Sequence, residues 1–166
     1  IFGDFDFLRK KNYNASYKDG AIYVLNNQEG NADILDDIVH EIGHSVEDNH
    51  QDLVYGDGAL EMEFLKKREI LRKEFSKEGI EVPEDVMSNP DYDQNLDMFF
   101  SEKVGYPRMT AIVQGIFYSP YAATSLREYF ANGFEAHYYH RDVYLQKVSP
   151  VLYDKISKLE ELHNET

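Results

Sequence analysis

Three residues, His40, Glu41 and His44, form the pattern H-E-x-x-H. On a helix, positions four residues apart lie on one face one turn apart, so both imidazoles could reach the same metal ion. A catalytic zinc ion takes three protein ligands and leaves one position for water. The ion lowers the pKa of that water, and a neighbouring carboxylate can take its proton. The pattern therefore predicts two zinc ligands, His40 and His44, and a general base, Glu41.

This chemistry requires a helix, and the residues around the motif favour one. The apolar residues of the stretch 34–48 recur at helical spacing: Ile34, Leu35, Ile38, Val39, Ile42 and Val46. Asn31 or Asp33 is a suitable N-cap. Gly43 is unfavourable inside a helix by about 1 kcal/mol relative to alanine. A residue without a side chain at that position indicates that another segment approaches closely there.

A third ligand is needed, and histidine and acidic residues compete for the role. His50 lies six residues after His44, as in one class of zinc peptidases, but Glu47 replaces the glycine that this pattern needs. Glu63 lies nineteen residues after His44, as in another class, within a stretch typical of a charged, solvated helix. Both remain candidates on spacing alone.

Two further candidates, Glu128 and Glu135, lie in the stretch 124–140, which is too rich in aromatic residues for a solvated face. A buried carboxylate is costly unless it has a partner, and either a metal ion or a basic side chain would serve. Glu135 lies two turns beyond Glu128, where it could orient a ligand without binding the metal. The residues alone leave the choice of third ligand open.

The stretches HEIGHSVED and SPYAATSLREYFANGFEAHY resemble the anthrax-lethal-factor-like zinc metalloendopeptidases, a gluzincin family that includes the bacterial Pro-Pro endopeptidases. In that family a Tyr precedes a Glu by seven residues, and the Glu opens a helix of pattern E-[FY]-F-A-x-x-F. Tyr121 and Glu128 have this spacing. The resemblance covers 17–162 and is weakest at 57–91, which we expect to be an insertion. Asn132 stands where lethal factor has an acid, a departure that concerns substrate specificity.

The resemblance implies that His40, His44 and Glu128 bind zinc. It implies that Glu41 is the general base and that Tyr121 donates a hydrogen bond to the oxyanion of the tetrahedral intermediate. The expected protein is thus a zinc-dependent endopeptidase with a zincin-like α+β fold, acting on a protein or peptide substrate.

The stretch 20–26, GAIYVLN, has the β-branched and aromatic residues typical of a strand, and a turn, NNQEGN, follows at 26–31. The resemblance implies that this strand forms the sheet edge beside the active-site helix. An extended peptide can add to such an edge as a further strand. We therefore predict that Ala21, Tyr23 and Leu25 contact the substrate.

The rest of the chain is expected to be mostly helical, with one small sheet in a single domain over 1–166. The expected helices span 59–77, 94–104, 124–140 and 149–163. The apolar stretch 109–118 fits either a helix or a buried strand, and the polar stretch 50–57 is expected to be a loop.

Composition excludes several classes of partner. The chain has 166 residues, no Cys and a formal net charge of −14. Without cysteine there can be no disulfide or thiolate metal site, and the acidic excess argues against a nucleic-acid partner. No apolar run approaches the ~20 residues that span a membrane. No Lys or Arg occurs between Asp19 and Glu63, which gives the motif region a negative field that could attract basic substrates. For charge alone, a soluble, self-repelling surface is the favoured interpretation.

The chain begins with Ile1 rather than Met, and we expect it to be a fragment or processed product of a longer chain. The absence of cysteine with abundant Asn, Lys and Tyr fits a secreted bacterial protein. Two alternatives to catalysis are an inactive zincin-fold module that only binds, and a structural zinc site closed by a fourth ligand such as His50. The intact H-E-x-x-H motif favours catalysis, because an inactive copy should have lost part of it.

Overall fold

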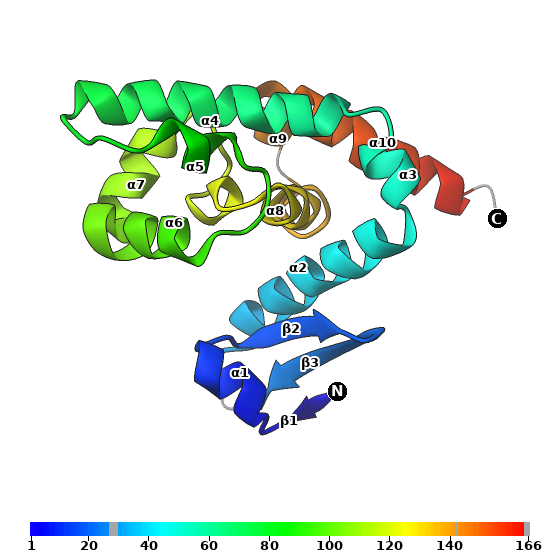
Figure 1. Cartoon of the computed structure of the whole chain (residues 1–166). Coiled ribbons are helices and arrows are strands. Elements are labelled where there is room, and N and C mark those ends of the chain that lie inside the picture. Colours follow the sequence, from blue (N-terminus) through cyan, green and yellow to red (C-terminus); the bar gives the residue numbers. More distant parts are fainter. Residues whose placement is uncertain (27–29, 142, 165–166) are drawn as a thin grey trace.

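A computed structural model describes residues 1–26, 30–141 and 143–164. This part of the chain is mostly helical and includes one small sheet, which confirms the predicted α+β class (Figure 1). None of its helices combines the length and the apolar character that a membrane span needs. The sheet packs against α2 (Asn31–Asn49), and the short helix α1 (Asp6–Lys11) lies beside the sheet. The later helices lie on the far side of α2 (Figure 1).

Three strands form the sheet: β1 (Phe2–Gly3), β2 (Ala15–Lys18) and β3 (Ala21–Leu25). Their order is β1-β3-β2, with β3 parallel to β1 and antiparallel to β2. The β2–β3 hairpin turns at Asp19 and Gly20, whose φ angles are +51° and +77°. A two-residue hairpin turn of the common type needs positive φ at both positions, and Asp-Gly supplies it.

The strand predicted to form the sheet edge is the central strand, so that prediction is wrong. β3 pairs with β1 at Val24 and Leu25 and with β2 along its whole length. At Val24 and Leu25, β3 therefore already has a strand on each side. The edge that packs beside α2 is β2. Composition identified 20–26 as a strand, but it did not identify the two strands that pair with it. Those strands lie within 1–18, a stretch that showed no clear pattern.

The helices are α1 (Asp6–Lys11), α2 (Asn31–Asn49), α3 (Gln51–Tyr55), α4 (Ala59–Lys77), α5 (Glu84–Ser88), α6 (Gln94–Met98), α7 (Tyr106–Val113), α8 (Leu126–Tyr138), α9 (Tyr144–Val148) and α10 (Pro150–Asn164). A π-helical segment, Phe99–Gly105, joins α6 to α7, and a 3-10 turn, Tyr121–Ala123, precedes α8.

Most of the predicted helices are confirmed, with small corrections at their ends. The apolar stretch 109–118 is helical as far as Val113. The stretch 50–57 was expected to be a loop but contains α3. The N-cap of α2 is Gly30, not Asn31 or Asp33. Part of the predicted turn 26–31 lies outside the described residues.

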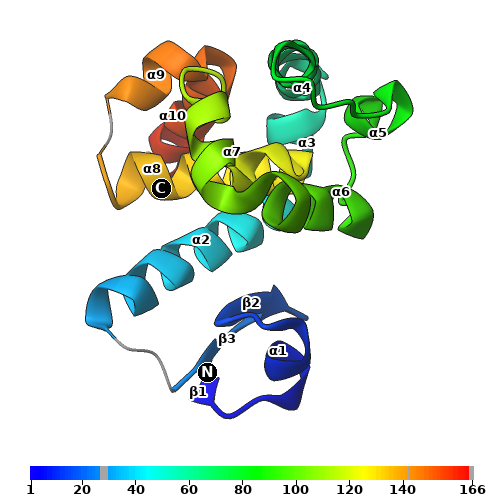
Figure 2. The ribbon, with the colours of Figure 1, turned by 90° about the vertical axis from the view of Figure 1, so that its left-hand side faces the viewer.

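Helix α2 lies between the N-terminal part, which consists of the sheet and α1, and the later helices, as two perpendicular views show (Figures 1 and 2). It packs on β2 and β3 on one side and on α8 on the other. A Cβ at Gly43 would lie 3.2 Å from both Ala131 Cα and Phe134 Cβ. This confirms the predicted close approach at Gly43. The frame around the motif is less apolar than predicted, since Leu35 and Ile42 are exposed.

Helix α4 forms one wall of the main core. Its buried face carries Leu60, Phe64, Leu71 and Phe75, all fully shielded from solvent. The Phe64 ring lies 5.9 Å from the Phe117 ring and 5.5 Å from the Tyr129 ring on α8, centroid to centroid. The segment 57–91, the expected insertion relative to lethal factor, therefore supplies a core helix of this fold.

Arg68 on α4 is fully buried and forms hydrogen bonds with the turn that precedes α8. Its Nε donates to the carbonyl oxygen of Ala123 at 3.0 Å, and its Nη2 donates to that of Thr124 at 2.5 Å. Its Nη1 donates to the carbonyl oxygen of Asn89 at 2.5 Å. Charged donors to buried carbonyls are stronger than neutral ones, so Arg68 fixes the position of the Tyr121–Ala123 turn.

Candidate metal centre

Helices α2 and α8 bring three metal-ligating side chains together. The Nε2 atom of His40 lies 3.0 Å from Glu128 Oε2, and the Nε2 atom of His44 lies 3.6 Å from the same oxygen. Two ligands that bind one tetrahedral zinc ion at about 2.1 Å lie about 3.4 Å from each other. The spacing and the donor types therefore fit one zinc ion held by His40, His44 and Glu128.

Local sequence explains why Glu128 lies at this position. Ser125 is the N-cap of α8, and its hydroxyl oxygen accepts a hydrogen bond from the Glu128 backbone N–H at 3.1 Å. Glu128 thus sits in the first turn, where the partial positive charge of the helix N-terminus favours a carboxylate. The side chain points to α2 because Gly43 lets the two helices approach each other closely.

The three ligands shift one another's pKa values. Burial by itself would lower the pKa of His40, but hydrogen bonds to Glu128 and Glu135 raise it to about 10. Burial likewise opposes the rise of the His44 pKa to about 9, which Glu128 and Glu47 cause. Burial would raise the Glu128 pKa, yet the two histidines lower it to about 2. Without metal these shifts favour a charged carboxylate beside protonated imidazoles, so protons compete with a metal ion for the two histidines.

Glu135 contacts the other side of His40. Its Oε2 atom lies 3.2 Å from His40 Nδ1, whereas Nε2 of that ring faces Glu128. A carboxylate on the second ring nitrogen fixes the tautomer and orientation of a metal-binding histidine. The structure thus places Glu135 where the sequence analysis expected a group that orients a ligand.

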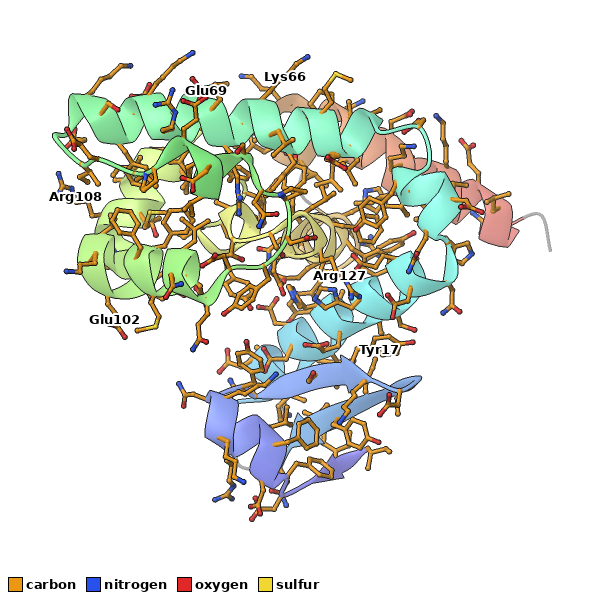
Figure 3. All side chains as sticks on the ribbon, viewed as in Figure 1. Tyr17, Lys66, Glu69, Glu102, Arg108 and Arg127 are labelled. Carbon is orange, nitrogen blue, oxygen red and sulfur yellow. The ribbon has the colours of Figure 1, made fainter. Side chains whose placement is uncertain are left out.

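Glu47 lies on the Nδ1 side of His44, and sequence reasoning did not single it out. It is 1% exposed, and its Oε1 lies 3.8 Å from His44 Nδ1, an ion-pair distance at which that nitrogen has no hydrogen bond among the described residues. The Tyr55 hydroxyl donates to Glu47 Oε2 at 2.9 Å, and Arg127 Nε donates to Oε1. In Figure 3, Arg127 lies close to α2 on the side facing the other helices, and Tyr17 lies on the side of the sheet. No periodic signal distinguishes such a buried glutamate from the exposed acids around it.

An open cavity of about 910 Å³, here called the central cavity, surrounds these groups. It is lined by residues 11–17, by the ligand-bearing faces of α2 and α8, and by residues of α6 and the π-helical segment. Glu41 and Tyr121 both line it, and the Tyr121 ring centroid lies 6.3 Å from that of His40. Burial and the charge of Glu128 raise the Tyr121 pKa, so its hydroxyl stays protonated and can donate.

Glu41 also contacts the edge strand. The backbone N–H of Tyr17 on β2 donates to Glu41 Oε2 at 2.5 Å. Because β2 is an edge strand, this hydrogen bond connects the predicted general base directly to the sheet edge that faces the central cavity.

The two competing ligand candidates lie apart from the three ligands. The Nδ1 atom of His50 lies 3.0 Å from the Val46 carbonyl oxygen, at the end of α2. Glu63 accepts hydrogen bonds from the backbone N–H groups of Val151 and Leu152, at 2.9 and 3.1 Å, at the start of α10. Glu63 therefore caps the start of α10. Its charged neighbours on α4 had indicated a solvated residue instead.

The predicted substrate residues do not lie at the site. Among the described residues that line the central cavity, the sheet is represented by β2 and not by Ala21, Tyr23 or Leu25. The Tyr23 ring packs instead against Phe5 and Phe7, with ring centroids 5.2 and 5.5 Å away. The predicted contact of these residues with substrate depended on their lying at the sheet edge, and the strand order removes that basis.

These donors form a candidate three-ligand metal site of the His-His-Glu type, beside the Glu41 carboxylate and the partly buried Tyr121 phenol. Comparisons of the chain with protein-family models, curated protein sequences and solved structures give no match. The geometry of the site and the sequence pattern are therefore the basis for a function.

Proposed function

We propose that the protein is a zinc-dependent endopeptidase with a zincin-like fold. One observation carries the proposal: His40, His44 and Glu128 converge at zinc-ligand spacing from two helices distant in sequence. Glu41 and Tyr121 line the same cavity. The resemblance to the lethal-factor-like endopeptidases falls on these same residues, which supports the proposal.

Each residue of the site has a role in peptide hydrolysis. Zinc, held by His40, His44 and Glu128, would polarise the scissile carbonyl and acidify water. Glu41 would take a proton from the attacking water and then pass it to the leaving amine. Tyr121 would donate its hydroxyl proton in a hydrogen bond to the oxyanion, since its raised pKa keeps it protonated.

The edge strand β2 is the element that would hold the peptide. An extended chain can add to a sheet edge through main-chain hydrogen bonds, and Ala15, Ser16 and Tyr17 line the central cavity. Asp97 and Glu102, from α6 and the π-helical segment, add acidic groups to its lining. The substrate would thus be a peptide bound along β2, with a preference for basic side chains.

The ligand number favours a catalytic over a structural zinc. A structural zinc site is usually closed by four protein ligands, whereas the group at α2 and α8 consists of three among the described residues. His50, the suggested fourth ligand, lies at the C-cap of α2 beside the Val46 carbonyl. A zinc ion held by three protein ligands would leave a position for the water that hydrolysis requires.

The experiment is metal analysis of the purified protein, paired with cleavage of a random peptide library before and after chelation. About one tightly bound zinc per chain is expected, with cleavage that chelation removes and zinc restores. Glu41→Gln should keep the zinc and lower kcat by about 10²- to 10⁴-fold, because the amide cannot accept a proton. The matched control, Glu61→Gln on the exposed face of α4, should cleave normally.

Three results would count against the proposal. Activity of Glu41→Gln close to that of the unchanged protein would remove Glu41 from the reaction. A protein that binds no zinc, or binds zinc and cleaves no member of the library, would instead support the binding module or the structural site.

A further inference from the structure

We propose that the chain carries a second divalent metal site, formed by Asp36, Glu135 and His140. It lies beside the first site but uses different ligand atoms. The inference does not depend on peptidase activity, because it concerns metal binding by side chains that have no role in the proposed hydrolysis except Glu135.

The spacing of the three side chains matches that of the first site. The Nε2 atom of His140 lies 3.2 Å from Asp36 Oδ1 and 3.4 Å from Glu135 Oε1. Ligands of one tetrahedral zinc ion lie about 3.4 Å apart. One ligand atom from each of the three residues falls within 4.8 Å of the others. One imidazole and two carboxylates are a donor set that zinc and related divalent ions accept.

A second observation points to a cation at this position. The Oδ1 atom of Asp36 is shielded from solvent and receives no hydrogen bond from the described residues, although His140 lies within ion-pair distance. A buried carboxylate oxygen without a donor is costly. A metal ion between Asp36 and His140 would remove this cost.

The negative charge of the surrounding carboxylates also favours a bound cation. The ion-pair partners of Asp36 and Glu135 within the described residues are histidines, His40 and His140, and not Lys or Arg. Asp37 adds a third carboxylate next to Asp36, and its Oδ2 atom is likewise buried without a hydrogen bond among the described residues. A divalent ion would balance an excess of negative charge that the histidines alone do not neutralise.

Glu135 connects the two sites. Its Oε2 atom faces His40 Nδ1, and its Oε1 atom faces His140 Nε2. An ion at the second site would fix the carboxylate that orients a ligand of the first. Binding at the second site would therefore help to orient His40 for the first.

The test is zinc binding by the full-length chain, measured by equilibrium dialysis followed by metal analysis. The unchanged protein should take up about two zinc ions per chain, the second more weakly than the first. His140→Ala and Asp36→Asn should each reduce this to about one. Asp36→Asn keeps the side-chain shape, so its result does not depend on whether a truncated variant folds.

The matched control is His137→Ala. His137 lies in the last turn of α8, three residues before His140, and pairs with a carboxylate outside both groups, Glu160, at 3.2 Å. It belongs to neither metal group, so this variant should still bind two ions. His44→Ala should lose the first site and keep binding at the second, which separates failure of one site from failure of the other.

A saturation at one zinc per chain in the unchanged protein would overturn the second site. Equal uptake by His140→Ala and the unchanged protein would do the same, since it would place the extra ion elsewhere. In either case Asp36, Glu135 and His140 form an ion-pair cluster, and the first site is unaffected.

Discussion

Gly43 on α2 lies against Ala131 on α8 so closely that a Cβ at Gly43 would stand 3.2 Å from Ala131 Cα. His44 follows Gly43 directly, and Glu128 lies one turn before Ala131. The contact therefore fixes the distance between the helix that carries two ligands and the helix that carries the third. The fit of His40, His44 and Glu128 to one ion depends on a residue that takes no part in the chemistry.

Gly43→Ala should weaken zinc binding more than it weakens the fold. The added methyl group meets backbone and Cβ atoms, and such overpacking costs about 1–3 kcal/mol, while alanine recovers about 1 kcal/mol of helix propensity. The free energy of unfolding should fall by up to about 2 kcal/mol, and the separated helices should hold zinc less tightly. Competition with a zinc chelator and urea unfolding of the metal-free protein would measure the two effects. Unchanged zinc affinity would show that the close approach does not position the ligands.

Glu128→Ala should abolish zinc binding, whereas Glu63→Ala should lower stability and leave zinc binding intact. Removing Glu128 deletes one of three ligands, so zinc should be lost at concentrations that saturate the unchanged protein. Removing Glu63 leaves two backbone N–H groups of α10 and the Tyr129 hydroxyl without their acceptor. That change should lower the free energy of unfolding by about 1–3 kcal/mol and leave zinc bound. Metal analysis and urea unfolding of both variants would reveal a wrong ligand assignment as a reversal of this pattern.

Glu47→Gln should reduce zinc affinity by about 10- to 100-fold, as removal of a group that orients a metal-binding histidine does. The amide keeps the volume of the side chain but loses the charge facing His44 Nδ1. The control is Asp48→Asn, since Asp48 pairs with the same Arg127 at a more exposed position, 2.8 Å away. Chelator competition should find the control close to normal. An equal loss in both variants would assign the effect to Arg127.

The metal-free protein should lose stability above neutral pH. The His40 pKa is raised from 6.5 to about 10 by Glu128 and Glu135, which outweigh burial. Its contribution is therefore complete below 6.5 and is lost as pH rises through 10. Burial also opposes the shift of the Glu128 pKa, which the two histidines lower from 4.5 to about 2. The Glu128 contribution is present above 4.5 and is lost as pH falls through 2.

Urea unfolding of chelator-treated protein between pH 5 and pH 10 would measure this dependence. The decline should be smaller in His40→Ala, which lacks the titrating group. Zinc affinity should rise over the same range, since bound protons compete with the metal. A flat profile in the unchanged protein would mean that His40 does not carry a proton in the folded, metal-free state.

The sequence predicted His40, Glu41 and His44 from spacing alone, because a helix converts a separation of four residues into a shared face. Spacing could not choose the third ligand, since Glu128 comes from another helix and no local rule relates the two. Only the resemblance selected Glu128. In the structure the Glu128 carboxylate lies 3.0 and 3.6 Å from the Nε2 atoms of His40 and His44, which is the separation expected of two ligands of one zinc ion.

The missed features share a physical cause. Glu47 and Glu63 stand among charged residues, and their sequence neighbours give no indication that both accept hydrogen bonds from distant segments. The place of β3 in the sheet was misjudged because a strand's composition does not reveal how many neighbours it has. That number depends on β1 and β2, whose stretches are short and lack a clear pattern.

The hydrogen bond from the Tyr17 backbone N–H to Glu41 Oε2 has a kinetic consequence under the proposed function. A peptide that paired with β2 at Tyr17 would compete with Glu41 for that N–H. Substrate binding along β2 would then break the hydrogen bond between Tyr17 and Glu41, and so free the Glu41 carboxylate to act as the base. Peptides too short to reach β2 should accordingly lose turnover number and not merely affinity.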